Sequence, residues 1–251
     1  MKKLLVILLF FPFLVFSQDL NDWFPKKNVK DLGTKIALVI GNADYSDAQK
    51  LINPINDAKL MHKSLQKLEF DTIIYKEDLA YNEMASLFNG YYHLQSNYDL
   101  SVIYYAGHGV QDEKGNSFLI PVDFKTGNKL GEFAISVRKL LLMFSFNEEN
   151  KNLFIFDACR NTYDTGISKP DIKEPLNVKI GFSTSHGYVA YDHPDLNNSI
   201  YTSVLAKILK TPSLTIHEIL NTTFNQVYVK TNKKQAPAQH FGYLLENDYL
   251  K

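Results

Sequence analysis

Short apolar runs alternate with helix-like patterns along most of this chain. Four runs are rich in apolar residues and too short for helices, and the last of them is apolar on consecutive positions, as is typical of a strand buried on both faces of a sheet. They are residues 35–41, 70–75, 100–105 and 153–156. Three stretches between them repeat apolar residues at spacings of three and four, and Asn53 and Pro54 supply an N-cap and a first helical residue for one of them. These stretches are residues 53–68, 82–94 and 136–146. The alternation predicts an α/β fold with a mainly parallel central sheet flanked by helices on both faces.

The remaining segments fit the same scheme. Residues 111–122 combine a turn-rich tip with a short apolar run, which predicts a small hairpin. Residues 161–179 contain Gly166, Pro170 and Pro175, which is loop chemistry. A strand is expected to resume at Ile180, and a last strand is expected within the tail. Helices are predicted at residues 199–209 and 215–229.

The N-terminus has the pattern of a secretory signal peptide. Two lysines precede an apolar stretch from Leu4 to Phe16, and Val15 and Ser17 are small enough for cleavage after Ser17. The stretch is shorter than the roughly 20 residues that cross a bilayer, so no stable membrane span is expected after cleavage. The predicted organisation is a signal peptide at 1–17, a lead-in segment at 18–34 and one domain at 35–251. The expected location is secreted or periplasmic.

Composition and charge limit the kinds of partner and reactive group that this chain can have. Apolar residues make up 45% of the chain, and 27 basic residues balance 27 acidic ones, so a general polyanion-binding role is not indicated and no nucleic-acid partner is expected. The chain has one cysteine, Cys159. A lone cysteine is often a buried apolar side chain. In an exported chain, however, it suggests an intermolecular bridge or a thiol kept for its reactivity.

His108 and Cys159 both follow directly after predicted strands. The carboxyl ends of parallel strands meet at one edge of a sheet, where ligands bind. If the two strands are neighbours, about 4.8 Å apart, the imidazole could take the thiol proton and create a nucleophile. The backbone N–H groups of Gly109 and Cys159 could then bind an oxyanion. The alternative is that Gly107-His108-Gly109 is only a tight turn.

Both motifs resemble those of a known family. Tyr104-Tyr-Ala-Gly-His-Gly109 and Phe156-Asp-Ala-Cys-Arg160, with histidine 51 positions before cysteine, are similar to the motifs of caspase-like cysteine peptidases. The resemblance is to the metacaspase and bacterial orthocaspase type of peptidase family C14, and it covers Lys35 to the C-terminus. It implies a caspase-like three-layer fold and a cysteine endopeptidase with His108 and Cys159 as its catalytic dyad.

The resemblance also implies a specificity. Animal caspases carry glutamine where this chain has Asp157, and an arginine where a rough alignment places Asp192. Metacaspases prefer Arg or Lys as the residue before the cleaved bond (P1) and use aspartates that match Asp57 and Asp157. The implied S1 pocket is therefore Asp57, Asp157 and Asp192, with cleavage after basic residues. The alternatives to substrate binding are structural roles: Asp57 could be a carboxylate that stabilises the start of its helix, and Asp157 could cap the end of its strand.

Two further expectations concern regulation. The 161–179 loop matches the region that many family members cut during activation, with Lys173 and Lys179 as candidate self-processing positions. No EF-hand, HExxH or CxxC spacing is present, so no metal site or required cofactor is expected. A calcium requirement and the oligomeric state stay open.

Proteins or peptides are the expected substrates. The alternative function is a catalytically idle caspase-like module for binding or regulation.

Overall fold

The computed structural model describes residues 33–147, 149–158, 161–162, 177–185, 197–240 and 250. The predicted signal peptide and nearly all of the lead-in segment lie outside these residues, as do Cys159, Lys173 and Asp192. The helices are α1 (Pro54–Lys67), α2 (Tyr81–Gln95), α3 (Leu130–Phe133), α4 (Val137–Ser145), α5 (Ile200–Ile208) and α6 (Ile216–Lys230). The strands are β1 (Lys35–Gly41), β2 (Thr72–Glu77), β3 (Leu100–Gly107), β4 (Gly109–Gln111), β5 (Ser117–Leu119), β6 (Ile135–Ser136), β7 (Lys151–Ala158), β8 (Asn161–Thr162), β9 (Val178–Phe182) and β10 (Ala238–His240).

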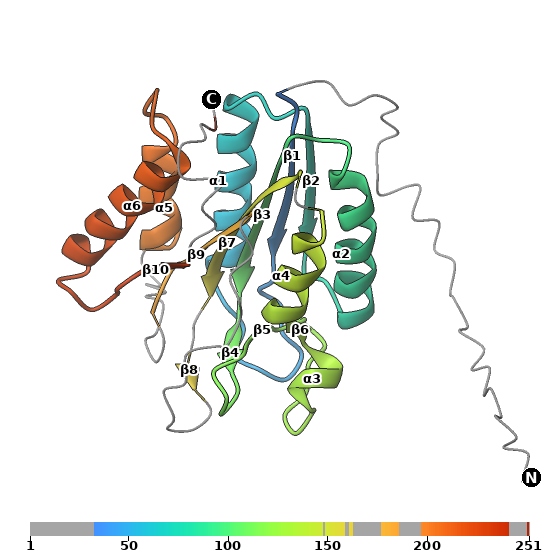
Figure 1. Ribbon diagram of the computed structural model, residues 1–251. Coiled ribbons are helices and arrows are strands. Elements are labelled where there is room, and N and C mark those ends of the chain that lie inside the picture. Colours follow the sequence, from blue (N-terminus) through green and yellow to red (C-terminus); the bar gives the residue numbers. More distant parts are fainter. Residues whose placement is uncertain are drawn as a thin grey trace, which may run out of the picture.

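The central sheet has the strand order β10-β9-β7-β3-β1-β2 (Figure 1). Each neighbouring pair is parallel except β10 and β9, which are antiparallel. A smaller sheet, β6-β5-β4-β8, lies beyond the carboxyl end of β3 and contains the predicted hairpin. The expected mainly parallel sheet is therefore confirmed, and the predicted last strand forms its antiparallel edge.

Helices cover both faces of this sheet. Helices α1, α5 and α6 pack on one face and helices α2 and α4 on the other, so the molecule has three layers (Figure 1). Successive side chains of a strand point to opposite faces. Tyr104 accordingly belongs to the core under α1 and α5, whereas Tyr105 belongs to the core under α2 and α4. Among the described residues, no helix combines the length and apolar character that crossing a membrane requires.

Local sequence fixes where several helices begin. Pro54 is the first residue of α1 and Asn53 occupies its N-cap position, although the Asn53 side chain makes no capping hydrogen bond. Ser199 caps α5 by accepting a hydrogen bond from the backbone N–H of Thr202. Thr215 and Glu218 form a reciprocal capping box at the start of α6, which satisfies backbone donors that a helix start leaves open.

One prediction about the 161–179 loop is wrong. Strand β9 begins at Val178, two residues earlier than expected, because Val178 and Ile180 are buried in the core under α2 and α4. Lys179 therefore lies inside the sheet with a fully buried side chain. A protease needs an exposed, extended segment, so Lys179 is not a cleavage position in the folded chain.

Candidate active site

The edge where β3 and β7 end is the centre of the candidate site. These strands are parallel neighbours, and their last paired residues are Gly107 and Ala158. His108 and Cys159 are the next residue of each strand in the sequence. The condition on which the dyad prediction rested, that the two strands are neighbours, is therefore met. Cys159 itself lies outside the described residues.

The imidazole of His108 is held by a backbone carbonyl. Its Nε2 lies 2.7 Å from the carbonyl oxygen of Gln49. A carbonyl can only accept a hydrogen bond, so Nε2 must carry a proton. In the neutral imidazole the lone pair is then on Nδ1. His108 is half-buried, and Nδ1 is the atom that can take a proton from a thiol.

Two tyrosine hydroxyls surround the backbone of His108. The N–H of His108 donates to the hydroxyl of Tyr45 at 2.7 Å, and the hydroxyl of Tyr105 donates to the carbonyl of His108 at 2.9 Å. The two hydroxyls lie 3.2 Å apart. A Cβ atom on Gly107 would come within 2.6 Å of both oxygens, so only glycine fits there. Gly109 begins β4 and is buried, pairing with Leu119.

Asp57 and Asp157 come together on the face of the sheet covered by α1 and α5. Asp157 follows Leu153 and Ile155 in the strand alternation and is 7% exposed, whereas Asp57 lies in the first turn of α1 and is 2% exposed. These two carboxylates are called the acid pair below. Ser199 bridges them, because its N–H donates to Asp57 Oδ1 at 2.9 Å and its hydroxyl donates to Asp157 Oδ2.

Further neutral donors complete the environment of the acid pair. The Asn198 amide donates to Asp57 Oδ1 at 3.0 Å, and the Thr202 hydroxyl donates to Asp157 Oδ2 at 2.7 Å. The hydroxyl of Tyr104 hydrogen-bonds that of Thr202. Burial and the neighbouring charge of Asp157 raise the pKa of Asp57 to about 8, although the donors from Asn198 and Ser199 lower it. At neutral pH the acid pair therefore holds one proton.

The contacts of the two aspartates extend beyond the two alternative interpretations, a helix-start carboxylate and a strand-end cap, which stay open. A carboxylate that only balances a helix dipole would face the N–H groups of its own helix or solvent. Asp57 instead faces the start of α5, where it accepts a hydrogen bond from Asn198, a residue 141 positions later in the chain. Asp157 accepts from the hydroxyls of Ser199 and Thr202 at the start of α5. The third predicted S1 residue, Asp192, lies outside the described residues.

The sequence patterns did not predict the residues that hydrogen-bond to the acid pair and to His108. Ser199 and Thr202 orient the acid pair, and Tyr45 and Gln49 orient His108. The consecutive tyrosines Tyr104 and Tyr105 were a usable signal, because alternation sends one hydroxyl to each face. The other contacts join loops distant in sequence, and no periodicity predicts them.

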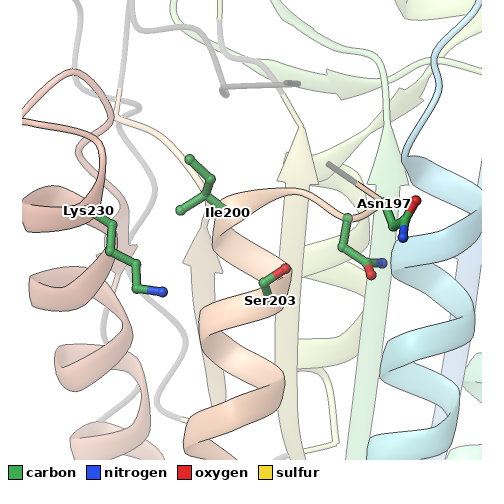
Figure 2. A pocket seen from close by; sticks show the side chains of 5 residues that line it. Asn197, Ile200, Ser203 and Lys230 are labelled. Carbon is green, nitrogen blue, oxygen red and sulfur yellow. The ribbon is translucent and has the colours of Figure 1, made fainter. Parts of the chain in front are cut away.

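A pocket of about 470 Å³ opens beside the acid pair (Figure 2). It lies between the start of α5 and the end of α6 and shares Asn198 with the acid pair. In Figure 2 the Lys230 side chain extends from α6 toward α5. The lining is Asn197, Asn198, Ile200, Ser203 and Lys230. Among these described lining residues Lys230 is the one charged side chain, and its charge is opposite to that of the acid pair.

Within the described part of the chain, no three or more His, Cys, Asp or Glu side chains are grouped so that they could hold a metal ion. The donors from Asn198, Ser199 and Thr202 contact one oxygen of each carboxylate, Oδ1 of Asp57 and Oδ2 of Asp157.

The fold and the sheet-edge motifs define a caspase-type domain. The family model for the caspase domain of C14 peptidases matches residues 34–247, so the chain belongs to this family and the expected caspase-like three-layer fold is confirmed.

Relatives are consistent with that assignment. The chain is 31% identical over 188 residues to human mucosa-associated lymphoid tissue lymphoma translocation protein 1, covering 72% of this chain and 22% of that protein. It is 30% identical over 206 residues to the paracaspase of Dictyostelium discoideum, covering 76% of this chain and 48% of that protein. The chain therefore matches about a fifth of one relative's length and about half of the other's. The metacaspase subtype stays a prediction.

Proposed function

We infer that this chain is an exported cysteine endopeptidase that cleaves peptide bonds after arginine or lysine. The observation that carries the proposal is the pairing of β3 with β7, which ends at Gly107 and Ala158, one residue before His108 and Cys159. Membership of a peptidase family supports hydrolysis as the reaction. The signal-peptide pattern of residues 1–17 supports export.

The reaction follows from the protonation state of the histidine. Nδ1 of His108 takes the proton of the Cys159 thiol, and the thiolate attacks the carbonyl carbon of the substrate. The backbone N–H groups of Gly109 and Cys159 bind the oxygen that becomes negative. The imidazolium then protonates the leaving amine, which leaves an acyl-enzyme. A water molecule, deprotonated by His108, releases the carboxylic acid and restores the thiol.

The acid pair supports the preference for a basic P1 side chain. A second negative charge brought against Asp57 and Asp157 would cost several kcal/mol, so an acidic P1 residue is disfavoured. A guanidinium or ammonium group can instead replace the proton that the acid pair holds. The donors that the α5 start supplies to the pair, Asn198, Ser199 and Thr202, are all neutral. Asp192 is proposed as a third acidic contributor.

The test is hydrolysis of fluorogenic peptides that differ only at P1. We expect turnover after arginine and lysine, much weaker turnover after aspartate, and none with the Cys159→Ala variant. Turnover that survives Cys159→Ala would contradict the proposed nucleophile. A wild-type protein without thiol-dependent turnover, with and without calcium, would favour the idle binding or regulatory module instead.

Export is tested separately from chemistry. Expression of the full chain in a bacterial host is expected to yield a periplasmic or secreted protein that begins at Gln18, which mass spectrometry of the mature N-terminus measures. A product that retains Met1 in the cytoplasm would contradict the proposed signal peptide while leaving the peptidase proposal intact.

A further inference from the structure

One irregular segment makes most of the described contacts to His108. Residues 42–50, called the 42–50 loop below, contain no helix or strand. Gln49 accepts from the imidazole, and Tyr45 accepts from the His108 backbone N–H. The ring of Tyr45 also packs against the imidazole, with 4.4 Å between centroids. Both the ring and the main chain of the histidine therefore depend on the conformation of this loop.

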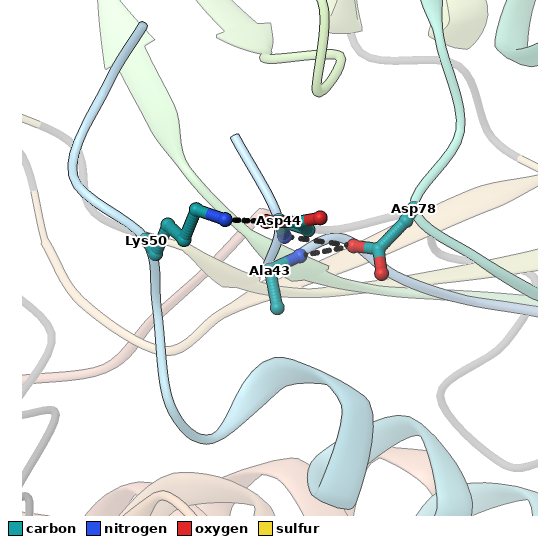
Figure 3. Close-up of polar contacts among 4 residues, drawn as sticks. All are labelled: Ala43, Asp44, Lys50 and Asp78. Carbon is teal, nitrogen blue, oxygen red and sulfur yellow. Dashed lines mark hydrogen bonds and ion pairs between the residues drawn. The ribbon is translucent and has the colours of Figure 1, made fainter. Parts of the chain in front are cut away.

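Asp78 fixes the start of the 42–50 loop. One carboxylate oxygen of Asp78 accepts from the N–H groups of Ala43, at 2.7 Å, and Asp44, at 2.9 Å (Figure 3). The Asp78 backbone N–H donates to the carbonyl of Gly41 at 2.9 Å. Asp78 follows β2 and is half-buried, with φ at 48°. Hydrogen bonds to a charged acceptor are roughly twice as strong as neutral ones, so this carboxylate is a firm anchor.

A second side chain, the buried amide of Asn42, also holds the start of the loop: it accepts from the N–H of Leu79 at 3.0 Å and donates to the carbonyl of Ile120 at 3.3 Å. The remaining attachments are backbone contacts or exposed. Ser46 donates its N–H to the carbonyl of Val122, and Thr126 donates its N–H to Asp47. Figure 3 also shows the ion pair between Lys50 and Asp44. Its side chains are 72% and 64% exposed, and exposed pairs contribute little. Asp78 is therefore the charged side chain that holds the loop, since it accepts from two of its backbone N–H groups.

The hydroxyl of Tyr45 connects the loop to the end of β3. It receives the His108 N–H, lies 3.2 Å from the Tyr105 hydroxyl and is 3.4 Å from the carbonyl of Ile120. Tyr45 is 1% exposed, and burial raises the pKa of its hydroxyl, so it stays neutral. A neutral hydroxyl can accept from His108 and donate onward at the same time.

We propose that Tyr45 and Asp78 are positioning residues for His108: Tyr45 acts directly on its backbone and ring, and Asp78 acts through the 42–50 loop that carries Tyr45 and Gln49. The proposal rests on the proposed peptidase function. Neither residue reaches the acid pair, which belongs to α1, β7 and the α5 start. Their loss should therefore affect the chemical step and leave binding of the P1 side chain unchanged.

The variants are Tyr45→Phe and Asp78→Asn. Phenylalanine keeps the ring and removes the hydroxyl, while asparagine tolerates the positive φ and removes only the charge. Misplacement of a catalytic group by about 1 Å can cost roughly 100-fold, so we expect kcat to fall about 10- to 100-fold for Tyr45→Phe and about 3- to 10-fold for Asp78→Asn. KM for an arginine P1 peptide should stay within about twofold.

Two controls match these changes. Tyr75→Phe removes a hydroxyl that donates to Glu77 on β2, and Lys50→Ala removes the exposed ion pair with Asp44. Both should keep wild-type kcat. Circular dichroism melting of every variant shows whether a loss of kcat reflects unfolding. A comparison of Tyr45→Phe with Tyr45→Ala separates the role of the ring from that of the hydroxyl.

A second readout does not depend on substrate. The chain has one cysteine, so the rate of alkylation by iodoacetamide reports on Cys159 alone. An imidazole held beside the thiol lowers its apparent pKa below the free value of about 8.5. We expect Tyr45→Phe and Asp78→Asn to move the pH profile of alkylation toward the free value, and the two controls to leave it in place. A purely structural role would lower the melting temperature without this shift.

The outcomes separate the two proposals. If the wild type is active with a low alkylation pKa and both variants keep its kcat and its alkylation profile, the positioning proposal is overturned and the peptidase proposal stands. If the wild type shows no thiol-dependent turnover and its cysteine alkylates like a free thiol, both proposals fail. If kcat and KM change together without a change in the alkylation profile, the residues act elsewhere and the positioning proposal is again overturned.

Discussion

The proton held by the acid pair predicts that preference for a basic P1 residue depends on pH. Burial and the charge of Asp157 raise the pKa of Asp57 to about 8, so one proton occupies the pair at neutral pH. If Asp57 and Asp157 form the S1 pocket as proposed, binding of an arginine side chain stabilises the fully ionised pair and releases that proton. The wild-type enzyme should therefore select arginine more strongly as pH rises toward 8, and the selection should level off above it.

The magnitude follows from the ionised fraction of Asp57. With a pKa of about 8, roughly one tenth of the molecules are fully ionised at pH 7 and roughly one hundredth at pH 6. If only this form binds arginine tightly, the selectivity changes by at most about tenfold per pH unit below 8. A singly charged pair retains some affinity, which makes the true slope smaller.

The assay compares two peptides with arginine or its neutral isostere citrulline at P1. Ionisation of His108 and Cys159 affects both substrates alike, so it cancels in the ratio of their kcat/KM values between pH 6 and 9. The matched control is Asp57→Asn, for which the ratio should be flat. A wild-type ratio that is constant across this range, or a slope that persists in Asp57→Asn, would refute the reasoning.

Three further predictions follow. Because the folded chain keeps on Asp57 a proton that the unfolded chain loses near pH 4, the free energy of unfolding should fall between pH 4 and 8, and Asp57→Asn should remove this fall, as urea unfolding at pH 5 and 8 measures. Gly107→Ala, whose Cβ meets two tyrosine hydroxyls, should cost about 1–3 kcal/mol, whereas Gly131→Ala, with open space around it, should be neutral or stabilising; equal melting temperatures would contradict this. If the chain processes itself within the 161–179 loop, Lys173→Ala should abolish the cut seen by mass spectrometry and Lys179→Ala should not move it, while an intact and fully active wild type would count against processing.

Sequence reasoning went far on the fold because the relevant signals are local. Consecutive apolar residues such as Leu153 to Phe156 predict a strand buried on both faces, and alternation with helices predicts a parallel sheet. The prediction failed at Lys179, where a charged residue interrupts the apolar pattern. A lysine can be buried when its ammonium group finds hydrogen-bond partners, and the local sequence does not show which residues those partners are. Here the Lys179 ammonium lies 3.4 Å from Nδ1 of His217 on α6.

The candidate site divides in the same way between sequence and tertiary structure. The residue types behind the proposed chemistry are visible in the sequence, because a single cysteine, a Gly-His-Gly segment and an aspartate before the cysteine are features of the linear chain. That β3 and β7 are neighbours, and that Asp57 and Asp157 share one environment, follows from how the whole chain packs. The same packing supplies the residues that orient them. Ser199 and Tyr45 lie 42 and 63 positions from the residues they hold, and contacts over such separations depend on packing of the whole chain.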